Sequence, residues 1–125
     1  MLKYVNGKII KSAIKDETTL IIKLARKETD PSQPMNEAFP VIMKEYAKFI
    51  TAICLIGGED EQYELTELFK QIRKAGLKTC LSTYLTDRSQ LNLNLLNELD
   101  YLQLGTKMYK KDYCPLLDVE DWIEM

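Results

Sequence analysis

The residues of this sequence best suited to chemistry are Gly57-Gly58-Glu59-Asp60, which come directly after an apolar run at residues 51–56. Such a run predicts a buried parallel strand, and α/β sheets bind ligands at the carboxyl ends of their strands. Two glycines let a ligand approach the backbone closely, and the Glu59 carboxylate can accept hydrogen bonds from a ligand ammonium group. The alternative is a tight strand-to-helix turn without a ligand, in which the two acids complement the helix dipole.

Two hydroxyl side chains, Ser82 and Thr83, lie near the end of the next apolar run, residues 77–85. The carboxyl ends of neighbouring parallel strands meet at one edge of a sheet, so both hydroxyls are expected beside Gly57 and Gly58. There they could contact a polar ligand. A strand end capped by these hydroxyls, with no ligand, is the alternative.

The cysteines, and the absence of histidine, limit which metal sites and catalytic groups the chain can form. Cys54, Cys80 and Cys114 are far apart in the chain, with no local pair of the kind that zinc and iron–sulfur sites use. We therefore predict structural thiols, two of them in core strands. The sequence contains no histidine, which excludes Ser–His and Cys–His nucleophile pairs and every histidine-containing metal site. No catalytic or metal-binding residue is predicted.

Length, charge and composition limit the classes of protein to which this chain can belong. A chain of 125 residues is long enough for one domain with a real core. A net charge of -2 offers no basic surface for nucleic acid or an anionic membrane. No apolar run approaches the roughly 20 residues of a membrane-spanning helix. Three scattered cysteines without an export signal favour a reducing cytoplasm.

The elements expected to position these groups alternate between strands and helices. Residues 1–25 predict N-terminal strands, 26–40 a proline-containing loop, 41–105 a βα core and 106–125 a C-terminal tail, within one domain over 1–125. The helices are expected at 37–49 and 60–75 and after Asp87, the last with its apolar face at 91–99, and the core strands at 51–56, 77–85 and 101–104. This order predicts an α/β fold with a mainly parallel sheet and right-handed crossovers.

Several single residues carry local predictions. Gly7 is placed at a turn between two short strands, and Gly76 at a left-handed helix end. Asp87 is expected to cap the last helix, with Gln90 completing a capping box, although the spacing of residues 91–95 also fits a strand. Trp122 is expected to anchor the tail.

Three segments in a fixed order carry a family resemblance. Residues 54–59 (CLIGGE), 77–83 (LKTCLST) and 99–105 (LDYLQLG), the last followed by Met108-Tyr109, resemble the radical-SAM activating proteins of anaerobic ribonucleoside-triphosphate reductase. The resemblance implies an incomplete α/β barrel of radical-SAM type. It implies that Gly57, Gly58 and Glu59 contact the amino group of S-adenosylmethionine, with Ser82 and Thr83 beside the same cofactor.

The chain departs from that family at the cluster. The family carries Cys-x-x-x-Cys-x-x-Cys after its first long strand, whereas residues 24–34 here (LARKETDPSQP) contain no cysteine. An iron–sulfur cluster is therefore not expected, and without one no side chain supplies the low-potential electron. The family's Asn-Gln-Arg-containing C-terminal segment is also missing, with residues 116–119 in roughly its place.

The sequence thus predicts a degenerate, non-catalytic relative that acts by ligand or protein binding. A reductase-type protein partner or self-association is expected, with no nucleic acid and no membrane. Two alternatives stay open. One is an active radical-SAM activating enzyme with an atypical iron–sulfur site built from Cys54, Cys80 and Cys114. The other is a regulatory domain that binds S-adenosylmethionine or a nucleotide.

Overall fold

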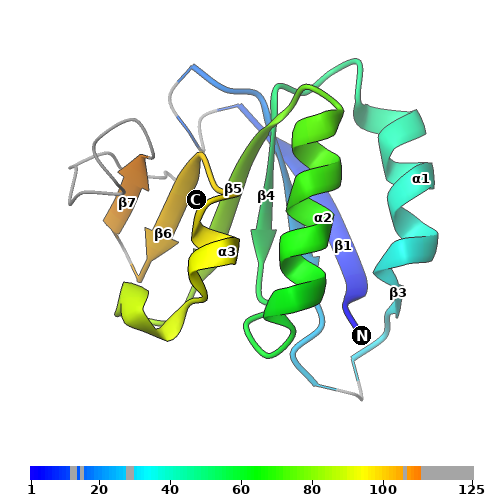
Figure 1. Ribbon diagram of the computed structural model, residues 1–125. Coiled ribbons are helices and arrows are strands. Elements are labelled where there is room, and N and C mark those ends of the chain that lie inside the picture. Colours follow the sequence, from blue (N-terminus) through cyan, green and yellow to red (C-terminus); the bar gives the residue numbers. More distant parts are fainter. Residues whose placement is uncertain (12–13, 15, 28–29, 106, 111–125) are drawn as a thin grey trace.

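A computed structural model shows one mixed sheet with its helices on one face (Figure 1). It describes residues 1–11, 14, 16–27 and 30–105, and the backbone of 107–110. The described strands form a seven-stranded sheet in the order β3-β1-β2-β4-β5-β6-β7. Their bounds are β1 (Lys3–Ile10), β2 (Thr19–Leu24), β3 (Gln33–Pro34), β4 (Ala52–Ile56), β5 (Lys78–Thr83), β6 (Tyr101–Leu104) and β7 (Lys107–Lys110). The helices are α1 (Met35–Tyr46), α2 (Gln62–Lys74) and α3 (Leu93–Leu96), with a 3₁₀ turn, η1, at Arg88–Gln90.

The centre of the sheet is built from repeated strand–helix units. Strands β2, β4, β5 and β6 pair in parallel and follow one another both along the chain and across the sheet. The helices α1, α2 and α3 connect them and lie on the same face (Figure 1). Right-handed crossovers that always step in one direction put every helix on one side. The predicted α/β class and its parallel βα units are therefore confirmed.

The edges of the sheet correct the prediction of a mainly parallel sheet. Strand β1 pairs antiparallel with both β2 and β3, and β7 pairs antiparallel with β6. The connections from β1 to β2 and from β6 to β7 are short enough to join antiparallel neighbours without a crossover helix, and β3 returns along the outer side of β1. Strand β7 lies within residues 106–125, which were expected to form a C-terminal tail, so the beginning of that segment belongs to the sheet.

Side chains on alternate strand positions divide the core into two clusters. The helix-covered face carries Leu20, Ile53, Leu55 and Leu81, which belong to the same buried cluster as Phe69 of α2. The opposite face carries a smaller buried cluster of Ile14, Ile21, Cys54 and Cys80. This division follows from the period of two in a strand, which sends neighbouring side chains to opposite faces.

Helix α1 begins earlier than predicted. The expected loop at residues 26–40 ends at β3, and the helix runs from Met35 to Tyr46 rather than over 37–49. The amide of Met35 donates a hydrogen bond of 2.8 Å to the carbonyl of Leu2, and the Met35 side chain is buried. This tertiary anchor starts the helix early, so Pro40 lies inside it instead of in its first turn.

Other local predictions have mixed outcomes. Gly7 lies within β1, opposite Ile22, so the predicted turn there is wrong. Gly76 adopts a φ of +84° directly after α2, as predicted. Asp87 does act as a cap, since its side chain accepts a hydrogen bond from the Ser89 amide, but the cap begins η1. The helix predicted after Asp87 shortens to α3, because the chain turns into β6 soon after.

No helix in the described ranges combines the length and the apolar character needed to cross a membrane. The predictions for Cys114 and for the Trp122 anchor fall outside the residues that the structure describes.

Candidate functional site

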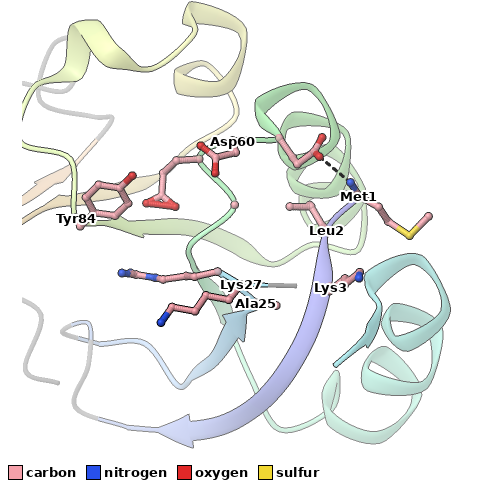
Figure 2. Close-up of a pocket in the computed structure, with 11 residues that line it drawn as sticks. Met1, Leu2, Lys3, Ala25, Lys27, Asp60 and Tyr84 are labelled. Atoms are coloured by element: carbon pink, nitrogen blue, oxygen red, sulfur yellow. Dashed lines mark hydrogen bonds and ion pairs between the residues drawn. The ribbon is translucent and has the colours of Figure 1, made fainter. Parts of the chain in front are cut away.

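A cavity of about 570 Å³ opens where β2, β4 and β5 end (Figure 2). Four segments line it: the N-terminus, the residues after β2, the turn between β4 and α2, and the residue after β5. The lining consists of Met1, Leu2, Lys3, Ala25, Arg26, Lys27, Gly58, Glu59, Asp60, Glu61 and Tyr84. The cavity therefore lies at the sheet edge where the sequence predicted a site.

The two glycines are required by the turn itself. Gly57 and Gly58 have φ values of +101° and +84°, a region that side-chain-bearing residues rarely adopt. A Cβ on Gly58 would stand 3.0 Å from a methyl of Leu2 and 3.1 Å from one of Leu24. The sharp turn brings Glu59 and Asp60 to the cavity before α2 begins. The tight strand-to-helix turn that the sequence predicted for Gly57 and Gly58 is thus present, and it does not require a ligand.

Glu59 is held in place by the end of the next strand. The hydroxyl of Thr83 donates a hydrogen bond of 2.7 Å to Glu59 Oε2. The same hydroxyl oxygen accepts a hydrogen bond of 3.1 Å from the amide of Leu85. The bond to Glu59 joins β5 to the β4–α2 turn and brings together two of the residues that the sequence singled out, while the bond from Leu85 orients the Thr83 hydroxyl.

Ser82 is not brought to this group by its side chain. Consecutive strand residues face opposite ways, so the Ser82 hydroxyl lies on the helix-free face, where it donates a 2.8 Å hydrogen bond to Gln103 Oε1. Its carbonyl contacts the turn by accepting a 3.4 Å hydrogen bond from the Gly57 amide. The structure therefore brings together four of the five predicted residues, namely Gly57, Gly58, Glu59 and Thr83. Ser82 contacts this group only through its main chain.

A cationic pair on the opposite side of the cavity was not foreseen. The backbone amides of Arg26 and Lys27 both donate hydrogen bonds of 3.2 Å to Asp30 Oδ2. These bonds lower the pKa of the Asp30 carboxyl and fix the turn that carries both cations. Figure 2 shows Lys27 across the space from Asp60. Both donors are backbone amides, which every residue type except proline carries, so the side chains of Arg26 and Lys27 give no sequence signal of this turn.

Tyr84 closes a third side of the cavity. The Arg26 guanidinium lies over its ring, 5.3 Å from the ring centre, which is a cation–π contact. Tyr84 is 60% exposed although it follows a buried strand. Tyr84 thus offers an accessible aromatic surface beside the charged walls (Figure 2).

The remaining wall is the chain's own N-terminus. The Met1 ammonium lies 2.7 Å from Glu61 Oε1 and 3.6 Å from Glu64 Oε1, and the Leu2 amide donates to Glu64. The hydrogen bond to Glu61 is the main cause of a raised pKa of the Met1 ammonium. Glu61 therefore already pairs with the Met1 ammonium. The other two carboxylates that line the cavity, Glu59 and Asp60, do not pair with Met1.

Cys54 and Cys80 are neighbours on β4 and β5, in the buried cluster of the helix-free face. Burial, together with a hydrogen bond to Cys54, raises the pKa of the Cys80 thiol well above its usual range. Both thiols are core side chains, as predicted. Within the described residues, no three cysteine or carboxylate side chains gather as a metal site would require.

Comparisons of this chain with protein-family models, with curated proteins and with solved structures return no match, so the functional assignment depends on the geometry of this cavity.

Proposed function

We propose that this chain is a binding protein for a small molecule that carries an α-amino-acid group, with S-adenosylmethionine as the first candidate. The observation that carries the proposal is one cavity with a carboxylate wall, Glu59 and Asp60, facing a cationic wall, Arg26 and Lys27. An amino-acid group carries one ammonium and one carboxylate, so it complements both walls at once.

Each wall has a defined task in this proposal. Glu59 accepts hydrogen bonds from the ligand ammonium, while Arg26 and Lys27 pair with the ligand carboxylate. The exposed Tyr84 ring offers a face against which a planar heterocycle can pack. The volume of about 570 Å³ falls inside the range of about 300–1,000 Å³ that is usual for small-molecule sites.

The sheet topology and the resemblance noted above support the choice of candidate. Four parallel strands that step in one direction, with all helices on one side, are the arrangement that a partial α/β barrel requires. In the radical-SAM proteins that the sequence resembles, the glycine-glycine-glutamate turn meets the amino group of this same cofactor. We propose a degenerate relative that keeps that turn without the cluster, and therefore binds without reductive cleavage.

Calorimetry with S-adenosylmethionine tests the proposal. The wild-type protein should bind, and Glu59→Gln should weaken binding by about 10- to 100-fold, because a hydrogen bond to a charged group contributes about 1.5–3 kcal/mol. The matched control is Glu67→Gln, an exposed carboxylate of α2 whose partner is Lys70. The control should bind like the wild type. Absence of binding heat with the wild-type protein would reject the proposal.

A second reading, an active enzyme with an atypical cluster, rests on the adjacency of Cys54 and Cys80. Their burial and the raised pKa of Cys80 oppose formation of the thiolates that iron requires. After anaerobic reconstitution with iron and sulfide, we expect no stable four-iron spectrum and the same iron content in the wild type and a C54S/C80S/C114S variant. A brown species that the triple variant loses would overturn the expectation that no cluster forms and would favour the enzyme reading.

A further inference from the structure

Thr83 makes two hydrogen bonds that together fix the direction of its hydroxyl proton. Its oxygen accepts from the Leu85 amide at 3.1 Å. Because a hydroxyl has a single proton, the bond of 2.7 Å to Glu59 Oε2 uses that proton. The Thr83 side chain is 4% exposed. It therefore has no second proton to offer a ligand and almost no surface with which to touch one.

The same bond orients the Glu59 carboxylate. Oε2 accepts one hydrogen bond, from Thr83, and Oε1 lies 3.9 Å from the point where a Cβ of Gly57 would stand. An ionised carboxylate is an acceptor only, so the group that meets Oε1 must be a hydrogen-bond donor.

We infer that Thr83 is a positioning residue that acts through Glu59, because its hydroxyl orients the carboxylate that the proposed ligand ammonium meets. This inference rests on the proposed function and adds to it a residue role. It also reassigns Thr83, which the sequence placed beside the cofactor as a direct contact.

A double-mutant cycle separates positioning from direct contact. With S-adenosylmethionine as the probe, Thr83→Val should weaken binding by about five- to tenfold, since valine keeps the shape and removes the hydroxyl. The same change in a Glu59→Gln background should alter binding less than twofold. Thr83→Ser should restore wild-type binding to within about twofold, because serine keeps the hydroxyl. An equal loss in both backgrounds would overturn the inference.

The matched control is Thr66→Val. Thr66 is also a buried threonine, and its hydroxyl donates a 2.7 Å hydrogen bond to the Gln62 carbonyl within α2, away from the cavity. This variant should bind S-adenosylmethionine like the wild type. An equal loss of binding in T66V and T83V would show a general effect of losing a buried hydroxyl and would overturn the positioning role.

Hydrogen exchange of the Leu85 amide tests, without any ligand, whether Thr83 links this amide to Glu59. Exchange should be faster in Thr83→Val, which removes the acceptor, and should match the wild type in Thr83→Ser. Absence of binding heat with the wild-type protein would reject the proposed function. The exchange rates would still show whether Thr83 holds the Leu85 amide. Equal rates in Thr83→Val and the wild type would show that Thr83 does not hold this arrangement.

Discussion

Replacing Gly58 by alanine is expected to lower the free energy of unfolding by about 2–5 kcal/mol. Two costs add at this position. The φ of +84° is a left-handed conformation that costs an L-residue about 1–2 kcal/mol. The new methyl would also stand 3.0–3.3 Å from side-chain carbons of Leu2, Leu24 and Leu65, all buried, and such overpacking costs about 1–3 kcal/mol.

Gly76→Ala is the matched control for this prediction. Gly76 has the same φ of +84°, but a Cβ there would meet no atom within 4 Å. Only the conformational cost of about 1–2 kcal/mol should therefore appear. Urea denaturation of both variants measures the difference, which is the packing component at Gly58. Equal losses in the two variants would show that Gly58 is needed for its conformation alone.

The elements of the parallel core could be predicted because their signals are local and periodic. The apolar run before Gly57 became β4, and the helical spacing after it became α2. The start of α1 could not be predicted, since it depends on a hydrogen bond from Met35 to Leu2, a residue 33 positions away in the chain. The antiparallel edges likewise depend on which strand lies beside which, and a local pattern does not specify the partner.

The candidate site could be predicted only in part, and for a physical reason. Gly57, Gly58 and Glu59 could be predicted because they form one local motif at a strand end. The cationic wall comes from the residues after a different strand, and only the sheet order brings Arg26 next to Tyr84. The face to which Ser82 points was accessible from the sequence, because adjacent strand residues alternate.

Helix α2 carries the second large stability prediction, because it begins directly after the candidate site. Phe69 is fully buried in the core cluster that joins α2 to the sheet. Phe69→Ala should lower the free energy of unfolding by about 3–5 kcal/mol, the sum of lost apolar burial and the cavity left behind. For a domain of this size the melting temperature should fall by roughly 10–20 °C. Thermal unfolding followed by circular dichroism measures the change.

Tyr63→Ala is the matched control, since Tyr63 is an aromatic residue of the same helix but is 80% exposed. Its loss should change stability by no more than about 0.5 kcal/mol. A small effect of Phe69→Ala would mean that α2 is not held against the sheet by this face. Asp60 would then lose one support, because the turn that carries it lies between β4 and the first residue of α2. Glu59 is also held from β5 by the hydroxyl of Thr83. The geometry of the proposed carboxylate wall therefore depends on the anchoring of α2 at Asp60 and on the bond to Thr83 at Glu59.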